Sequence, residues 1–290
     1  MADWSETRTW IDGAWHEGNV PVIGPRTHAF WLGSSVFDGA RAYDGLLPDI
    51  DAHCARVNRS AGSLGLEPTM APEEIASLAR DGVAQFHENT ALYIRPMYWA
   101  EAGGYKSVPA DPASTRFLLC LHAAPMPPAG AAERLALTPF RRPTLDCMPT
   151  DAKAGCLYPN NGRAIMHAKE RGFDSALVLD ALGNVAETAT SNIFIVRDAE
   201  VITPIPNGCF LAGITRSRTM SLLRDVGYTV TERVVTVDDV RAADEAFTTG
   251  NYAKVTPIVG FEDVTFPIGP VSAKARELYT TWAQDTQRGG

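Results

Sequence analysis

Several kinds of residue are scarce in this chain of 290 residues, and each scarcity excludes a class of protein. The five cysteines are scattered and form no Cys-x-x-Cys pair, so we expect neither a disulfide framework nor a metal site. No apolar run reaches the ~18 residues of a membrane-spanning helix. The start of the chain also lacks the cationic and apolar regions of a secretion signal. These features predict a reduced, cytoplasmic protein with no membrane partner.

Positive charge is also in short supply. The chain carries 26 Lys and Arg against 34 Asp and Glu, a formal net charge of −8, and has no run of basic residues. Because phosphate neutralisation dominates nucleic-acid binding, we expect no nucleic-acid partner. Only five of the cationic residues are lysines, so chemistry that needs a primary amine has few candidates.

The chain does contain apolar stretches that alternate with helical patterns, which predicts an α/β (α+β) protein. Strands are predicted at 90–99, 115–122, 175–180, 192–197, 230–237 and 246–249, and helices within 50–66 and at 72–80 and 215–226. A proline-rich stretch predicts an interdomain linker at 124–133. This linker would separate a small N-terminal α/β domain, 1–123, from a larger C-terminal domain, 134–290.

The first segment that could carry chemistry surrounds Lys153. The small residues Ala152, Ala154 and Gly155 flank it, and none of them would block an approaching planar group. Lysine becomes nucleophilic when burial or a nearby cation removes its proton. The alternative is a surface lysine in a loop rich in glycine and asparagine.

Two further segments could hold an anion and a ring nitrogen. Gly213-Ile214-Thr215 precedes a predicted helix. Gly213 would let the backbone come close to a ligand, and Thr215 could cap the helix beside free N–H groups that favour an anion. Glu187 lies between two predicted strands and could accept a hydrogen bond from a protonated ring nitrogen. Alone, the first could be an ordinary helix cap and the second a solvated glutamate in a hairpin.

The order of the three segments is more informative than any one of them. Glu187 follows Lys153 by about 34 positions, and Gly213 follows about 26 later. An amine for an aldehyde, a carboxylate for a pyridinium and a cradle for phosphate are what pyridoxal 5′-phosphate requires. We therefore expect this cofactor.

Other segments agree in order and wording with one family. They are 28–41, His53-x-x-Arg56, Tyr93-Ile-Arg95-Pro, Lys153-Ala-Gly, Glu187 followed by Asn192-Ile-Phe, Gly213-Ile-Thr-Arg, and Thr249-Gly250 with Thr256-Pro257. Over nearly its whole length the chain resembles the fold-type IV pyridoxal-phosphate enzymes, most closely the branched-chain amino acid aminotransferases. The resemblance implies a two-domain architecture with the active site between the domains.

The resemblance also implies roles for the matching residues. Lys153 would bind the cofactor aldehyde and move a proton at the substrate α-carbon, Tyr158 would donate to the ring O3′, and Glu187 would keep the pyridine nitrogen protonated. Arg56, whose planar fork suits phosphate, would bind the phosphate with Ile214 and Thr215. The other implied cofactor-binding positions are Thr190, Asn192, Gly213, Gly250 and Asn251. The implied substrate-binding positions are Leu32, Phe37, Gly39, Tyr93, Arg95, Tyr105, Ser107 and Tyr252.

Arg95 indicates the second substrate. An unpaired cation inside an apolar strand is costly, so Arg95 needs either a protein carboxylate or that of a substrate such as 2-oxoglutarate. The family resemblance thus implies ping-pong transamination between a branched-chain or other hydrophobic amino acid and 2-oxoglutarate. The loop 103–108 matches one that reaches into the neighbouring subunit's pocket, which implies a homodimer.

The sequence departs from the branched-chain pattern at Leu32, Thr190, Ala212 and the run Gly250-Asn251-Tyr252. The usual residues are an aromatic, Gly, Pro and Gly-Thr-Ala. Tyr252 adds bulk where the substrate α-carboxylate normally meets backbone. The alternatives are therefore a D-amino acid or (R)-amine transaminase or an aminodeoxychorismate lyase-like enzyme on the same fold. A binding protein that has kept the fold without activity is a further alternative.

Overall fold

The computed structural model describes residues 3–128 and 130–287, and the chain divides into two compact units. Among these residues, unit 1 takes 3–126, 152–156 and 283–287, and unit 2 takes 127–128, 130–151 and 157–282. The first change of unit falls inside the proline-rich stretch. The predicted C-terminal domain 134–290, however, included two segments that the structure assigns to unit 1. They belong there because Ala154 bridges to Val36 and the Leu47 N–H donates to the Gln287 carbonyl.

Unit 1 is built on an antiparallel sheet in the order β2-β1-β6-β5-β3, with β4 also paired to β5. Its strands are β1 (Thr7–Ile11), β2 (Ala14–Glu17), β3 (Ser35–Phe37), β4 (Ala40–Ala42), β5 (Leu92–Ala100) and β6 (Thr115–Ala123). Its helices are α1 (His28–Leu32), α2 (Ile50–Ser63), α3 (Pro72–Val83), η1 (Tyr105–Ser107) and η2 (Pro112–Ser114).

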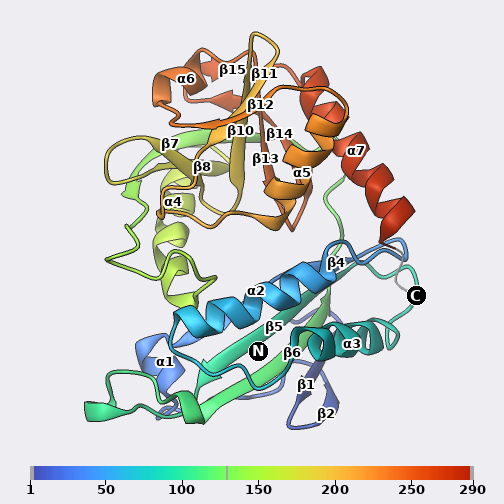
Figure 1. Ribbon diagram of the computed structural model, residues 1–290, viewed down its shortest axis with the longest axis vertical. Coiled ribbons are helices and arrows are strands. Elements are labelled where there is room, and N and C mark those ends of the chain that lie inside the picture. The colour runs from blue at the N-terminus through green and yellow to red at the C-terminus, as the bar shows by residue number, and fades with distance from the viewer. Residues whose placement is uncertain (1–2, 129, 288–290) are drawn as a thin grey trace. The chain divides into compact units, whose positions relative to one another are not determined.

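Helices α2 and α3 lie along one face of β5 and β6 (Figure 1). Ile94 and Leu121 are paired on that face and fully buried, and Gly82 of α3 packs against Leu121. Because side chains alternate along a strand, Tyr93 and Arg95 point to the opposite face. They lie opposite His122 and Cys120 of β6, and we call this side of the sheet the polar face.

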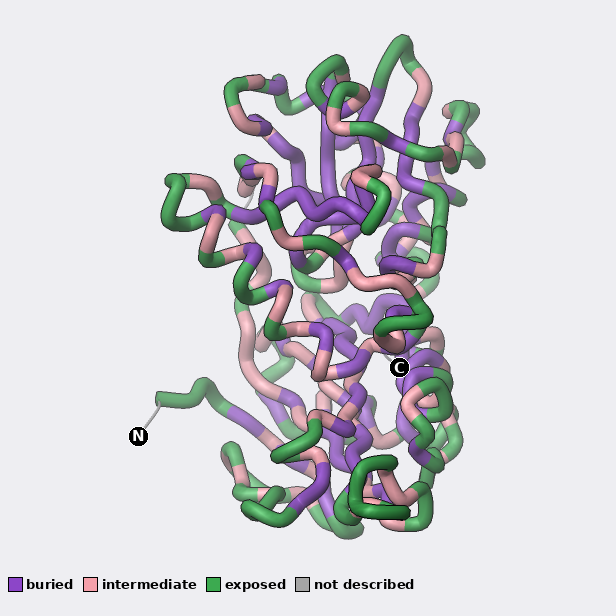
Figure 2. Tube along the Cα trace, turned by 90° about the vertical axis from the view of Figure 1, so that its left-hand side faces the viewer, coloured by how far each residue is buried: buried purple, intermediate pink, exposed green. Residues whose placement is uncertain are grey.

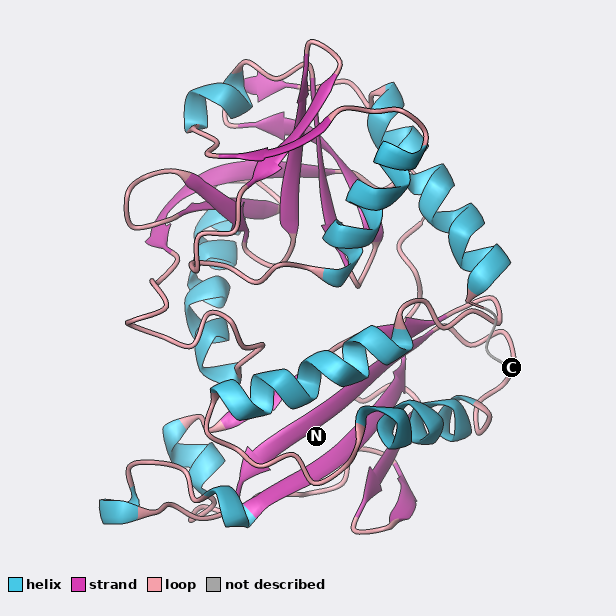
Figure 3. Ribbon diagram, in the orientation of Figure 1, coloured by secondary structure: helices cyan, strands magenta, loops and turns pink. Residues whose placement is uncertain are grey.

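Unit 2 is built on a second sheet, in the order β12-β11-β10-β13-β14-β7-β8-β9, with β15 paired to β14. Its strands are β7 (Glu133–Arg141), β8 (Ser175–Leu179), β9 (Val185–Thr188), β10 (Asn192–Arg197), β11 (Glu200–Pro204), β12 (Val230–Arg233), β13 (Glu245–Gly250), β14 (Lys254–Phe261) and β15 (Val264–Thr265). Its helices are α4 (Tyr158–Glu170), α5 (Ile214–Asp225), α6 (Val237–Arg241) and most of α7 (Pro270–Thr286); η3 (Gly155–Leu157) spans a change of unit. Figure 3 shows α4, α5 and α7 flanking these strands.

The core of unit 2 has two sides. Ile193 and Ile195 of β10 pack with residues of β7, β8, β11 and β14 into one buried cluster. Phe194 and Phe247 stack on the other side, where residues of α5 and α7 complete a second cluster. Strands buried on both faces read as continuous apolar runs, which is why the segment from Asn192 is recognisable in the sequence. The buried stretches of the chain are purple in Figure 2.

Most predicted elements are present with small changes of boundary, and two expectations are wrong. The predicted strand 230–237 ends at Arg233, because Thr236 and Asp239 form a capping box that starts α6. Helix α5 begins one residue early, with Gly213 as its N-cap, so Thr215 is its second residue and does not cap it. In the part of the chain described, no helix has the length and apolar character needed to cross a membrane.

Candidate active site

The Lys153 segment is fixed to unit 1 by its backbone. The Lys153 N–H donates to Ser60 Oγ of α2 at 3.1 Å, and its carbonyl accepts from the Phe37 N–H at 3.0 Å. The Lys153 ammonium lies 5.0 Å from the centre of the Phe37 ring. Lys153 is half-buried, so it is not a lysine of a solvated loop. The structure thus brings together two predicted site residues, Lys153 and Phe37.

Arg56 is oriented by a buried carboxylate that sequence reasoning left without a role. Its Nε and Nη2 donate to the two oxygens of Asp38 at 2.6 and 2.8 Å, and His53 Nδ1 lies 2.7 Å from Asp38 Oδ1. Burial alone would raise the pKa of Asp38, but the charges and hydrogen bonds of Arg56 and His53 hold it below its ordinary value. The spacing His53-x-x-Arg56 was the available signal, because a histidine and an arginine on one helical face both favour an acid as their partner.

On the polar face of unit 1, three predicted substrate residues adjoin. An added Cβ at Gly39 would lie 2.6 Å from Tyr93 Cζ, so the Tyr93 ring needs glycine there. The Arg95 guanidinium lies 5.0 Å from the centre of the Tyr93 ring. Its Nε is buried without a hydrogen-bond partner, and among the described residues Arg95 forms no ion pair. Among the described residues, therefore, no carboxylate balances this cation.

Leu32, Tyr105 and Ser107 lie apart from that group, in α1 and the loop that follows β5. His28 of α1 joins these two segments, because its Nε2 lies 3.2 Å from the Val108 carbonyl. Its Nδ1 lies 2.7 Å from Ser34 Oγ, just after α1. Leu32 and Tyr105 are exposed.

In unit 2, Glu187 is buried in β9, so it is not the solvated hairpin glutamate of the alternative interpretation. One oxygen forms an ion pair with Arg142, and the other accepts from Asn192 Nδ2 at 3.3 Å. Arg142 also donates to Asn161 Oδ1 of α4 at 2.5 Å, one turn after Tyr158, which is the first residue of α4. Sequence reasoning missed Arg142; a buried carboxylate requires a cation, but nothing in the sequence showed which arginine supplies it.

Hydrogen-bond donors gather at the N-terminus of α5. No side chain caps this helix, and its N-cap Gly213 packs so closely on Asn192 Oδ1 that a Cβ would collide with it. Thr249 lies opposite Asn192 in the sheet, and its buried Oγ1 has no partner among the described residues. Asn251 Nδ2 is likewise buried without a partner. Uncapped N–H groups and unpartnered donors fit an anion such as phosphate.

Three other predicted positions border this cluster. Gly250 packs against Ser191, where a Cβ would lie 2.7 Å from Ser191 Oγ. Thr190 is exposed at the tip of the turn that joins β9 to β10. Tyr252 is 56% exposed. Among the described residues, no three His, Cys, Asp or Glu side chains gather in a way that could hold a metal ion.

Each chemical need of pyridoxal phosphate has a matching group in these two units: an amine, a buried carboxylate, and unpartnered donors at a helix N-terminus. These side chains are the groups that a pyridoxal-phosphate enzyme requires. Within that class, residues 35–261 match the family of class IV amino-transferases. The chain belongs to this family, so the predicted family, fold class and cofactor are confirmed.

Individual relatives agree with this assignment. A branched-chain-amino-acid aminotransferase from Pseudomonas aeruginosa is 32% identical over 286 residues, covering 93% of this chain and 91% of the relative. The structure of an aminotransferase from Brucella abortus bound to PLP is 52% identical, with a TM-score of 0.95 over 96% of this chain and 99% of that one. The branched-chain amino acid aminotransferase from Thermoproteus uzoniensis, solved with norvaline, is 30% identical, with a TM-score of 0.88 over 97% and 95%.

A further solved structure holds a covalent adduct. It is a branched-chain amino acid aminotransferase complexed with N-(5′-phosphopyridoxyl)-L-glutamate, and we call it the glutamate-adduct relative. It is 30% identical to this chain, with a TM-score of 0.90 over 98% of this chain and 96% of that one.

Proposed function

We propose that this aminotransferase moves the amino group of a branched-chain or other hydrophobic amino acid to 2-oxoglutarate in a ping-pong cycle. The name of the Pseudomonas aeruginosa relative supports the hydrophobic donor. The adduct in the glutamate-adduct relative supports the glutamate and 2-oxoglutarate pair. The reaction would take place in the cytoplasm, as the cysteine pattern predicts.

The proposed cofactor site follows from the family resemblance; when bound, the cofactor ring supplies an acceptor for electrons from the substrate α-carbon. Lys153 would bind the aldehyde carbon and move the proton at the α-carbon. Tyr158 would donate to O3′. Glu187 would accept from the protonated ring nitrogen, and its ion pair with Arg142 would hold the carboxylate in place. The burial of Glu187 supports these roles, because a carboxylate that only faced solvent would not need to be buried.

The phosphate would be bound by the uncapped N–H groups of Ile214 and Thr215, with Asn251 as a side-chain donor. Arg56, whose Nε and Nη2 donate to Asp38, would bind the phosphate together with these residues. Thr190, Asn192, Gly213 and Gly250 complete the proposed cofactor site. Among these, Gly213 and Gly250 leave the space that a Cβ would occupy.

The choice of 2-oxoglutarate as acceptor depends on the environment of Arg95. Its Nε is buried and unpartnered, and the adjoining polar-face residues Tyr93 and His122 supply no negative charge. A carboxylate at the far end of the substrate would satisfy this cation, which a monocarboxylate acceptor cannot do. Phe37, Gly39 and Tyr93 would line the same pocket, and the aromatic rings suit an aliphatic donor. Tyr252 would border the α-carboxylate.

We further propose a homodimer. Phe30 and Trp31 of α1 are 63% and 54% exposed, and the next residue, Leu32, is also exposed. Tyr105 and Val108 are exposed too, and the contact between His28 and the Val108 carbonyl joins their loop to α1. Apolar groups gathered at a surface mark an interaction site. A second copy of the chain would cover them, with Tyr105 and Ser107 reaching the partner's substrate. The mass in solution tests this: a monomer that persists at high concentration would rule it out.

The function is tested by glutamate formation from 2-oxoglutarate with L-leucine, D-alanine or (R)-1-phenylethylamine as donor. L-Leucine is expected to be used. Glutamate from only D-alanine or the amine would instead identify a D-amino acid or (R)-amine transaminase. Lys153→Ala should abolish both turnover and the visible absorbance of the bound cofactor; a loss of only a few-fold would mean that another lysine reacts.

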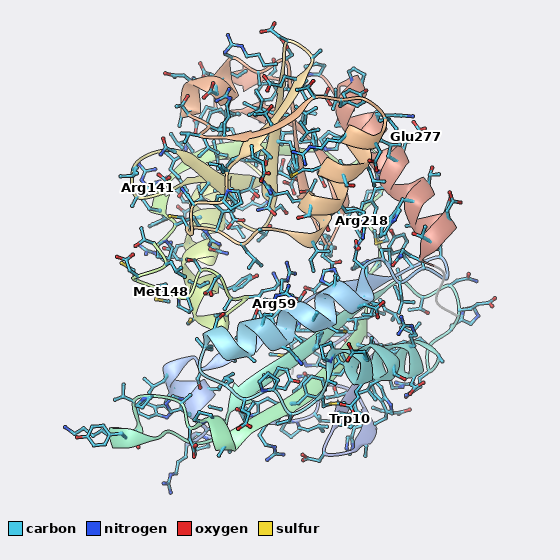
Figure 4. The ribbon with its side chains drawn as sticks, viewed as in Figure 1. Trp10, Arg59, Arg141, Met148, Arg218 and Glu277 are labelled. Atoms are coloured by element: carbon cyan, nitrogen blue, oxygen red, sulfur yellow. The ribbon has the colours of Figure 1, made fainter. Side chains whose placement is uncertain are left out.

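The acceptor is tested separately by Arg95→Met. Loss of a hydrogen bond to a charged group should raise KM for 2-oxoglutarate by about 10- to 100-fold, while KM for the keto acid of leucine stays nearly unchanged. Arg59→Met is the matched control, because Arg59 is exposed and projects from α2 (Figure 4). Equal effects of Arg95→Met on both keto acids would contradict the assignment.

A further inference from the structure

Lys254 stands apart from the other lysines of the chain. All five lie among the described residues, and Lys254 is the only one that is buried. It begins β14 with a φ of 65°, a left-handed conformation that non-glycine residues seldom adopt. Its ammonium donates to Asn251 Oδ1 at 2.8 Å. Lys254 therefore ends a tight turn by turning its charge back onto the side chain three residues earlier.

This hydrogen bond decides which way the Asn251 amide faces. An ammonium has three donors and no acceptor, so it can only meet the amide through Oδ1. The Nδ2 group must then point away from Lys254, and it is buried with no partner in the part of the chain that the structure describes. A neighbour that could both donate and accept would leave the amide free to present either end.

The Asn251 turn adjoins the donor cluster of unit 2. Gly250, the preceding residue, packs on Ser191, while Thr249 lies opposite Asn192. Asn192 in turn packs on Gly213, the N-cap of α5. The buried Oγ1 of Thr249 is a second unpartnered donor at this place, independent of the helix N-terminus.

We propose that Lys254 is a positioning residue that holds Asn251 with Nδ2 turned toward the cofactor phosphate. This inference rests on the proposed function, in which the phosphate binds at the N-terminus of α5. Lys254 does not itself contact the phosphate; it selects the donor end of an amide whose acceptor end would repel a phosphate oxygen. The asparagine and the lysine therefore act as one unit.

A purely structural role makes a different prediction. The Lys254 ammonium also lies 5.7 Å from the centre of the Tyr279 ring of α7. If Lys254 only anchored α7, its removal would destabilise unit 2 without a preference for phosphorylated ligands. The readout must therefore compare ligands that differ in phosphate alone.

The experiment measures dissociation constants of the full-length apoprotein for pyridoxal 5′-phosphate and for pyridoxal, by absorbance titration. Lys254→Met should weaken the phosphorylated ligand by about 10-fold or more, the value of a charge-assisted hydrogen bond, and leave pyridoxal unchanged. Asn251→Ala should do the same, and the double variant should be no weaker than Asn251→Ala alone. Lys254→Arg, which keeps only donors, should recover most of the affinity, and Lys274→Met serves as a control at a lysine outside the cluster.

Three results would overturn the proposal: unchanged pyridoxal 5′-phosphate affinity in Lys254→Met, equal weakening of both ligands, or additive losses in the double variant. If Lys254→Met does not fold, Asn251→Asp gives the answer, because it keeps the Lys254 partner but has no donor. It should lose affinity for the phosphorylated ligand only, and wild-type affinity would refute the role. A wild-type protein that binds both ligands equally would instead show that the proposed phosphate site itself is wrong.

Discussion

Replacing Asp38 by Asn removes the carboxylate that holds Arg56 and His53 in the interior of unit 1. Asp38 is fully buried, and its two oxygens accept from Arg56 at 2.6 and 2.8 Å. Removing one partner of a buried ion pair leaves the other charge uncompensated, which costs about 3–5 kcal/mol. We therefore expect Asp38→Asn to lower the free energy of unfolding of the apoprotein by that amount, measured by urea denaturation at pH 7.

The pH dependence gives this prediction a second measurable consequence. The pKa of Asp38 is held below its ordinary value in the folded protein. The stabilisation is therefore fully present above the unfolded pKa of about 3.9 and is lost as the pH falls through the lower folded pKa. The difference between wild type and Asp38→Asn should not fade as the pH falls from 7 to 5 and should shrink only in stronger acid.

Helix α2, which carries His53 and Arg56, also carries a matched control. Asp51 pairs with Arg80 at 3.3 Å, but its side chain is 79% exposed. Asp51→Asn should therefore change the free energy of unfolding by about 1 kcal/mol or less. The reasoning would be refuted if the two variants were equally stable, or if the effect of Asp38→Asn already faded between pH 7 and pH 5.

Further variants test the packing around two glycines and the charge near His122. Gly213→Ala would place a Cβ against Asn192 Oδ1 and should cost about 1–3 kcal/mol of stability, as overpacking does. In a thermal melt, Gly162→Ala, in α4 with open space around it, should stabilise by up to about 1 kcal/mol; equal melting points for the two variants would contradict the argument. Burial, followed by the charges of Arg95 and Arg41, lowers the pKa of His122. An NMR titration should give a midpoint below about 6.5 that rises in Arg95→Met, and an unchanged midpoint would show that Arg95 does not act on this ring.

Much of the fold could be predicted because its strongest signals are local. The strands β5, β6 and β10 are apolar runs, and α3 begins at Pro72 with acidic residues in its first turn, as helices commonly do. The start of α5 was misplaced by one residue because Thr is a common N-cap, and only the tertiary packing of Gly213 on Asn192 shows that glycine takes that position.

The candidate site could be predicted where a residue type is itself the signal, as with Lys153 and Glu187. Its supporting residues were harder to predict. The spacing of His53 and Arg56 indicates an acid but does not show that Asp38 supplies it, and Arg142 contacts Glu187 from a segment far away in sequence. Nothing in the local pattern distinguishes Arg142 from the adjacent Arg141, although Arg142 is buried and Arg141 is exposed. The assignment of residues 152–156 to unit 1 likewise depends on pairing with β3, which lies more than a hundred positions earlier.

The five-residue insertion that carries Lys153 has a consequence for how the chain can be divided. The polypeptide crosses between the units four times, so both ends of this short stretch are covalently tied to unit 2 while its backbone pairs with β3. A fragment that stops at residue 126 keeps β3 but loses the amine, and the complementary fragment keeps the amine but loses the strand that aligns it. Split at that point, neither polypeptide expressed by itself can assemble the reactive set, and activity would return only when the two halves associate.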